Sequence, residues 1–260
     1  MSEKLLSKKT IIVTGTARGM GRTMVELFAK SGANVIAHAR EETNEHINFC
    51  ERMTKENGVK VIPIYFELKD PKQIKNAVKE IREIKFPIDG VVNNAGITYN
   101  ALFQMSNMDE VRNQMEVNFF APYLFTQYIS KLMVRNKQGS IVNISSTAAQ
   151  DGNSGKSAYG ASKAALLSMT LCISEELAAS GIRANVICPG ITDTDMVSSM
   201  PEYVLDIQRK ATFLKKLGTT SDIAHMALYL LSDKSAYITG QVFRVDGGVT
   251  EYAKRELQNE

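Results

Sequence analysis

The feature that most constrains this fold is a regular alternation of short β-branched runs with longer amphipathic segments. The intervening segments, such as residues 20–30 and 111–134, carry apolar residues at three- and four-residue spacing, as helices do. Because strands with almost continuous apolar sequence need cover on both faces, the pattern predicts a parallel sheet between two layers of helices. The runs predicted to be strands cover residues 10–15, 34–39, 60–66, 88–96, 139–145, 181–189 and 241–248.

The length of the chain and the continuity of this pattern indicate one domain. The chain has 260 residues, a size at which α/β proteins commonly form a single core. No long linker, internal repeat or low-complexity tract interrupts it. Residues 190–234 form the one long stretch without a predicted strand before the last one, and their first part, ITDTDMVSSMPEYV, has the composition of a loop. We therefore expect a single domain over residues 1–260, with a substrate loop or lid at about residues 190–217.

Charge and cysteine content narrow the class of protein. The formal net charge is +3, without a basic stripe or an aromatic–basic pattern, so we expect no nucleic-acid partner. The three cysteines are widely spaced, which fits neither a disulfide framework nor a zinc site. No apolar run reaches membrane-spanning length, and the N-terminus enters the first strand without a signal-peptide pattern. These observations favour a cytoplasmic protein that has no membrane partner.

The histidines give no metal motif. His38, His46 and His225 are isolated in the sequence, with no second histidine or carboxylate at ligand spacing. We therefore expect no metal site.

A glycine-rich turn follows the first predicted strand. The sequence TGTARGMG places Gly15, Gly19 and Gly21 between that strand and a helical pattern. Glycines permit a tight turn there, and they let backbone N–H groups and the helix N-terminus approach a pyrophosphate. The spacing is G-x-x-x-G-x-G rather than the commoner G-x-G-x-x-G, but its place in the first strand–helix unit predicts a dinucleotide site.

A second motif, YGASK, separates Tyr159 from Lys163 by four positions. On a helix, the phenol and the ammonium would share a face. A phenol titrates near pKa ~10, and a neighbouring cation lowers that pKa, as an acid or base working near neutrality requires. By itself the pair is equally compatible with an ordinary helix start.

Together these motifs resemble those of the short-chain dehydrogenase/reductase family. The resemblance rests on TGTARGMG, NNAG at residues 93–96, Asn118 in MEVNFFAP, Ser146 in ISSTAA, YGASK, PGITDTDM at residues 189–196 and VDGG at residues 245–248. It covers nearly the whole chain in the family's order and spacing. It implies an α/β fold with one Rossmann-type, doubly wound parallel sheet of about seven strands. It also implies an oxidoreductase that interconverts a ketone and a secondary alcohol.

The same resemblance gives roles to four side chains. Tyr159 would exchange the proton, while Lys163 would lower the pKa of Tyr159 and bind the nicotinamide ribose. Ser146 would hold the carbonyl oxygen, and it is favoured over Ser145 by strand alternation and by the family's spacing to the tyrosine. Asn118 would bind a water that links Lys163 to solvent, and the alternative is an amide that only kinks its helix.

The resemblance also implies a nicotinamide cofactor, and the end of the second strand favours NADP(H). Members of the family that prefer NAD place an Asp there, whereas this chain has Ala39 followed by Arg40, with Arg18 in the glycine turn. An Asp would repel a 2′-phosphate, and two guanidiniums would bind it through charge-assisted hydrogen bonds. The other expected cofactor contacts, besides Tyr159 and Lys163, are Gly15, Thr16, Gly19, Met20, Gly21, Glu67, Leu68, Asn94, Ala95, Gly96, Pro189, Gly190, Thr192 and Thr194.

The sequence leaves the substrate open. The resemblance is nearest to the 3-oxoacyl-acyl-carrier-protein reductases, in which a basic patch beside the site would receive the acidic carrier protein. Lys137 stands where such enzymes often carry a basic residue, but Ser180 replaces a second one. A sugar, polyol, steroid-like or secondary-metabolite ketone is therefore the alternative. A non-catalytic dinucleotide sensor is a third reading, which the intact catalytic set disfavours.

Two of the predicted helices indicate self-association. Residues 107–135 and 157–180 carry apolar side chains on more than one face, and only one face can cover the sheet. We therefore expect these helices to pair between copies, as the resemblance also implies, in a homotetramer or homodimer.

Overall fold

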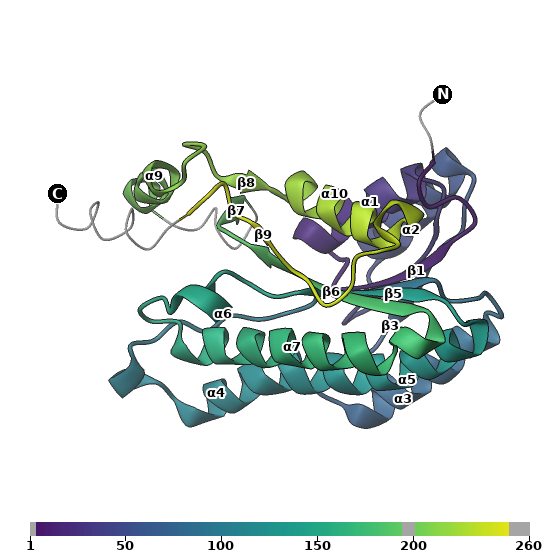
Figure 1. Ribbon diagram of the computed structural model, residues 1–260, viewed down its shortest axis with the longest axis horizontal. Coiled ribbons are helices and arrows are strands. Elements are labelled where there is room, and N and C mark those ends of the chain that lie inside the picture. Colours follow the sequence, from purple (N-terminus) through teal and green to yellow (C-terminus); the bar gives the residue numbers. More distant parts are fainter. Residues whose placement is uncertain (1–3, 194–200, 250–260) are drawn as a thin grey trace.

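The computed structural model describes residues 4–193 and 201–249. At its centre lies a parallel sheet of seven strands in the order β3-β2-β1-β4-β5-β6-β9, with a layer of helices on each side (Figure 1). The strands are β1 (Thr10–Thr14), β2 (Asn34–Ala39), β3 (Val61–Tyr65), β4 (Gly90–Asn93), β5 (Gly139–Ile144), β6 (Ile182–Pro189) and β9 (Val242–Val245). The predicted α/β fold, with one doubly wound parallel sheet of Rossmann type, is confirmed.

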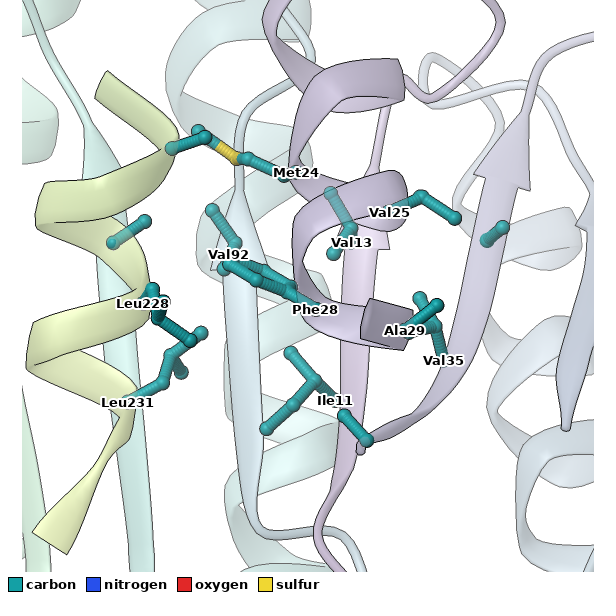
Figure 2. Close-up of a cluster of buried hydrophobic side chains, with 14 of the residues drawn as sticks. Ile11, Val13, Met24, Val25, Phe28, Ala29, Val35, Val92, Leu228 and Leu231 are labelled. Atoms are coloured by element: carbon teal, nitrogen blue, oxygen red, sulfur yellow. The ribbon is translucent and has the colours of Figure 1, made fainter. Parts of the chain in front are cut away.

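The two helical layers cover opposite faces of the sheet. One layer contains α1 (Gly19–Lys30), α2 (Asn44–Asn57) and α10 (Thr220–Leu231), and the other contains α3 (Pro71–Glu83), α4 (Met108–Met115), α5 (Ala121–Asn136) and α7 (Ser157–Glu176). Successive side chains of a strand point to opposite faces. Accordingly, Ile11 of β1 lies in the first core and Ile12 in the second. Figure 2 shows the first core, where Phe28 from α1 and Leu228 from α10 lie beside Val92 of β4.

Local sequence explains where the helices begin. Asp70 accepts hydrogen bonds from the first free N–H groups of α3, and Pro71 is the first residue of that helix, where its missing N–H costs nothing. Thr219 and Asp222 form a reciprocal capping box at the start of α10. Among the described residues, no helix is long and apolar enough to cross a membrane.

The order of the strands determines where a ligand can bind. From β1 the chain builds outward to β3 and then returns to β4 on the other side of β1. The loops after β1 and β4 therefore diverge, and such a reversal opens a crevice at the carboxyl ends of the strands. The glycine turn, NNAG, Ser146 and the Pro189–Gly190 turn all follow strands at this edge.

Two segments differ from the sequence-based expectations. The stretch expected to lack strands contains β7 (Thr192–Asp193), which pairs in parallel with β8 (Gly218–Thr219), so that expectation was wrong. These strands are two residues long, too short to give a periodic signal. The helix expected over residues 111–134 is interrupted by a π-helical turn (Glu116–Phe120) between α4 and α5. The lid at about residues 190–217 includes α9 (Glu202–Ala211) and residues outside the described part, and it remains a prediction.

Candidate active site

The four side chains expected to carry catalysis converge at this edge of the sheet. Tyr159 and Lys163 lie on α7, Ser146 follows β5, and Asn118 lies in the π-helical turn. The hydroxyl groups of Tyr159 and Ser146 share a hydrogen bond. A Cβ built on Gly96 would lie 3.1 Å from Asn118 Oδ1 and 3.2 Å from Lys163 Nζ, so these two groups meet at one point beside the backbone.

The choice between the two serines is resolved by their contacts. Ser145 is buried and donates to the backbone oxygen of Lys163 at 2.8 Å, so its hydroxyl is used inside the fold. Ser146 accepts from the N–H of Ala148 at 3.1 Å and faces Tyr159. Both serines follow the end of β5, and only the side chain of Ser146 interacts with the tyrosine.

The π-helical turn directs Asn118 inward. Its Oδ1 accepts from the N–H of Ile97 at 2.9 Å, and its Nδ2 donates to the carbonyl of Ile97 at 2.9 Å and to Ser162 Oγ at 3.0 Å. π-helical turns of this kind frequently mark functional sites. The amide thereby ties the loop after β4 to α7, and its expected binding of a water stays a prediction.

Burial governs the protonation of the Tyr159–Lys163 pair. Burial raises the pKa of the Tyr159 phenol, and the hydrogen bond from Ser146 acts in the opposite direction. Lys163 donates to the carbonyl of Ile144 at 2.9 Å, and burial lowers its own pKa to about 8. In the chain by itself, desolvation of the phenol dominates its pKa, so the expected lowering by Lys163 together with a bound oxidised cofactor stays a prediction.

The glycine turn has the shape of a phosphate cradle. Gly15 and Gly19 have φ values of 72° and 58°, which favour glycine. A Cβ on Gly21 would lie 2.0 Å from the carbonyl oxygen of Gly15, so no side chain fits there. A Cβ on Gly19 would meet nothing within 4 Å, which leaves space in front of the N-terminus of α1. These residues fit a pyrophosphate group.

Asn94 and Ala95 join this turn to the loop after β4. Asn94 Nδ2 donates to the carbonyls of Thr14 and Gly15, at 2.9 and 3.1 Å. The N–H groups of Asn94 and Ala95 donate to Thr14 Oγ1. Asn94 Oδ1 is buried and has no partner in the described part of the chain, so it is a free acceptor beside the cradle.

The end of β2 supports the predicted phosphate preference only in part. Ala39 is buried, and Arg18 and Arg40 are exposed. Arg40 forms a 2.9 Å ion pair with Glu41, so a phosphate would have to displace a carboxylate. An exposed ion pair of this kind is worth about 0–1 kcal/mol, which a charge-assisted bond to phosphate exceeds.

Thr16 and the histidines form a network that the sequence did not reveal. Thr16 is fully buried, and its Oγ1 lies 3.0 Å from the carbonyl oxygen of His38 and 2.8 Å from His46 Nε2. The N–H of Gly15 donates to His38 Nδ1 at 3.3 Å. The histidines are isolated in the sequence, and the network arises because parallel pairing of β1 with β2 places Thr14 beside His38, so that Thr16 lies near both histidines.

The other residues predicted to contact the cofactor differ in their burial and in their partners. Met20 is half-buried against the first core, and Leu68 is buried in the second. Glu67 accepts from the N–H of Lys69 at 3.0 Å. Pro189 and Thr192 are buried, and Thr194 lies outside the described residues. A Cβ on Gly190 would lie 2.7 Å from Asp246 Cβ, so this turn is packed against the segment after β9.

An ion cluster that the motifs did not predict supports the Ser146 loop. Arg244 of β9 binds Asp151 with two hydrogen bonds of 2.6 and 2.8 Å, and its Nε donates to Asp246 at 2.8 Å. Asp151 is the last residue of the short helix α6 (Ala148–Asp151), which begins two positions after Ser146. The cluster therefore joins the Ser146 loop to the end of β9.

The expected landing patch for a carrier protein is not beside this site. Lys137 is the C-cap residue of α5, two positions before β5, and a Cβ on Gly181, which directly precedes β6, would lie 2.4 Å from the carbonyl oxygen of Lys137. Both positions are at the amino ends of the strands, whereas Ser146 follows the carboxyl end of β5. The expectation of a basic patch beside the active site was wrong for a single chain, because the length of the strands separates the edge of the sheet near Lys137 from the edge near Ser146.

Within residues 4–193 and 201–249, no cluster of three or more histidine, cysteine or acidic side chains could hold a metal ion.

Comparisons with known proteins agree with this geometry. The family model described as enoyl-(acyl carrier protein) reductase matches residues 15–250. The chain is 35% identical to the 3-oxoacyl-acyl-carrier-protein reductase of Thermotoga maritima over 94% of this chain and 98% of that protein. The structure is also similar to the 3-oxoacyl-acyl-carrier-protein reductase of Brucella melitensis, with a TM-score of 0.89, 28% identity and coverage of 95% and 93%.

A further structural relative has a different substrate. It is a gluconate 5-dehydrogenase from Burkholderia cenocepacia in complex with NADP and tartrate, with a TM-score of 0.89, 26% identity and coverage of 94% and 96%. The fold, the converging Ser–Tyr–Lys set and these matches lead to one conclusion: the chain belongs to the short-chain dehydrogenase/reductase family of nicotinamide-dependent oxidoreductases.

Proposed function

We propose that this protein is an NADPH-dependent reductase that converts a ketone to a secondary alcohol. The observation that carries the proposal is the contact between the hydroxyls of Tyr159 and Ser146 beside the buried Lys163. Two hydroxyl groups that face one point can both donate to a carbonyl oxygen, where negative charge develops during reduction. This favours C=O as the reacting bond.

The chain's own groups supply the proton and the orientation. Reduction needs a hydride on the carbonyl carbon and a proton on its oxygen; a reduced nicotinamide cofactor, whose pyrophosphate the glycine cradle would hold, would supply the hydride. Tyr159 donates its proton to the carbonyl oxygen, while the Ser146 hydroxyl donates a hydrogen bond to the same oxygen. The raised pKa of Tyr159 suits this direction, because the phenol remains protonated at neutral pH. Lys163 donates to the carbonyl of Ile144, and Asn118 donates to the carbonyl of Ile97. These hydrogen bonds support the backbone around Tyr159 and Ser146.

The proposed cofactor is NADP(H). The glycine cradle and the unpartnered Asn94 Oδ1 fit the dinucleotide, and the exposed side chains of Arg18 in the glycine turn and Arg40 after β2 support a contact with a 2′-phosphate. Ala39 offers no carboxylate to compete for the ribose. The Burkholderia relative is described as an NADP complex, which agrees with this choice.

Two substrate classes compete, and each has an observation in its favour. The names of the sequence relatives favour a 3-oxoacyl thioester carried by acyl carrier protein. A cavity of about 610 Å³, lined by Gly155 and Ser157 near the start of α7, has Leu102, Phe103 and Met105 among its other lining residues, and these apolar side chains suit an aliphatic chain. The Burkholderia enzyme favours a polar acid or sugar instead. A cytoplasmic homotetramer or homodimer is part of the same proposal.

The test is NADPH oxidation with an acetoacetyl thioester against a panel of sugars, diketones and oxo acids. Tyr159→Phe serves as the matched variant, because it removes one hydroxyl and leaves the ring in place. We expect kcat to fall by a factor on the order of 10²–10⁴ with NADPH binding retained. A variant that keeps nearly parental turnover on a good substrate would mean that Tyr159 is not the proton donor.

A further inference from the structure

A second lysine lies beside Tyr159 on the same helix. Lys156 is the N-cap residue of α7, three positions before the tyrosine, and its Nζ lies 5.4 Å from the centre of the Tyr159 ring. Lys156 precedes the first helical residue, and this contact brings its ammonium next to the proposed proton donor. It is half-buried there.

The ammonium of Lys156 has no acidic counterpart in the described part of the chain. No hydrogen bond or ion pair to its Nζ occurs among those residues, and the first turn of α7 holds no acidic residue. Asp151 and Asp246, two acidic groups from segments next to the site, are both bound by Arg244. Burial lowers the pKa of Lys156, which is the cost of holding this cation away from water and from a counter-charge.

We propose that Lys156 binds a carboxylate of the substrate, so that this enzyme acts on an oxo acid whose carboxylate lies a few bonds from the reacting ketone. This rests on the proposed function, since it uses the same Tyr159 and Ser146. The ammonium lies over the ring, and no hydrogen bond joins it to the Tyr159 hydroxyl among the residues that the structure describes, so we expect it to meet a group beyond the carbonyl and not the reacting oxygen. An anion there offsets the cost of burying the lysine.

The lining of a nearby cavity indicates the polarity of the rest of the substrate. Gly155 and Ser157, the neighbours of Lys156 in the chain, line a cavity that Lys156 itself does not line, together with the apolar Leu102, Phe103 and Met105 and polar residues such as Gln104. The three apolar side chains are 59%, 82% and 75% exposed. An aliphatic remainder covers apolar surface better than a polyol does, so the substrate is an aliphatic oxo acid.

The experiment compares charged and neutral ketones of the same shape. The parent protein is assayed by NADPH oxidation with acetoacetate against methyl acetoacetate, and with levulinate against methyl levulinate. We expect kcat/KM to be at least about tenfold higher for one of the acids than for its ester, as expected for one charge-assisted contact. In Lys156→Met this acid-to-ester ratio falls by about 10- to 100-fold, and Lys156→Arg restores most of it.

Lys131 provides a matched control. Its Nζ lies 5.4 Å from the ring of Tyr128, also three positions away, but on an exposed part of α5. Lys131→Met should leave the acid-to-ester ratio unchanged. Reduction of the esters with no preference for either acid in the parent would overturn this inference and leave the ketone reductase intact. Equal losses for acid and ester in Lys156→Met would also overturn it, because the lysine would then only tune Tyr159. No NADPH oxidation with any ketone of the panel would overturn both proposals.

Discussion

Acidification should destabilise this protein through His38, a residue that no catalytic motif contains. His38 is 2% exposed at the end of β2. Its Nδ1 accepts from the N–H of Gly15, so the neutral ring carries its hydrogen on Nε2 and donates it to the carbonyl of Phe66 at 2.9 Å. A second proton would remove the acceptor that holds the glycine turn and would place a charge in the core.

The size of the effect follows from the pKa. Burial lowers the pKa of His38 from 6.5 to about 4. Below pH 6.5 the unfolded chain binds a proton that the folded chain does not bind until about pH 4, so the free energy of unfolding decreases across this range. At about 1.4 kcal/mol per pH unit, the loss from His38 amounts to about 3 kcal/mol, and it is absent above pH 6.5.

Urea unfolding at pH 7 and pH 4.5 measures this loss. The free energy of unfolding should decrease by roughly 2–3 kcal/mol more in the parent than in His38→Gln, whose amide does not titrate. His225→Gln is the matched control, because His225 is exposed on α10 and should behave like the parent. The reasoning is refuted if the parent and His38→Gln lose the same stability between the two pH values.

The other predictions concern the cofactor, the tyrosine and assembly. NADPH should bind at least about tenfold more tightly than NADH, and Ala39→Asp combined with Arg40→Leu should reverse the order in a fluorescence titration. Equal affinities in the parent would exclude a phosphate contact. In Ser146→Ala the pKa of Tyr159 should rise further, because its hydrogen bond to Ser146 lowers that pKa, so the alkaline rise of the alcohol-oxidation rate should move to higher pH. Light scattering at micromolar concentration should give a dimer or tetramer, and a monomeric mass would contradict the apolar helix faces formed in part by Phe120 and Leu171.

The sequence predicted the sheet and the cradle because local composition determines them. The segment TIIVT is buried at every position, so its apolar run could only be a central strand. Gly21 has no room for a side chain, and this steric requirement is visible in the sequence as a glycine. The position of Ser146 relative to Tyr159 followed from the family resemblance.

The remaining features depend on contacts between distant segments, which no spacing rule describes. His46 and Thr16 are 30 positions apart, and Arg244 and Asp151 are 93 apart. The pKa of Tyr159 could not be predicted from YGASK, because its main cause is burial by the surrounding loops and not the lysine four positions away. A motif identifies the reacting groups, while their protonation depends on what the tertiary fold places around them.

The groups proposed to react and the groups proposed to select the substrate are held in different ways. The proposed reacting groups are closely packed: a Cβ on Gly160 would lie 2.7 Å from the carbonyl oxygen of Ala148, and a Cβ on Gly96 would meet Lys163 Nζ at 3.2 Å. A substitution at Gly160 would therefore have to move backbone next to Ser146 and Tyr159, whereas one at Gly96 would displace the ammonium of Lys163 slightly. Lys156 is near Tyr159 only through its side chain, so it can change without disturbing the backbone of the cradle. We therefore expect the choice of ketone to depend on residues such as Lys156 and not on Ser146 and Tyr159.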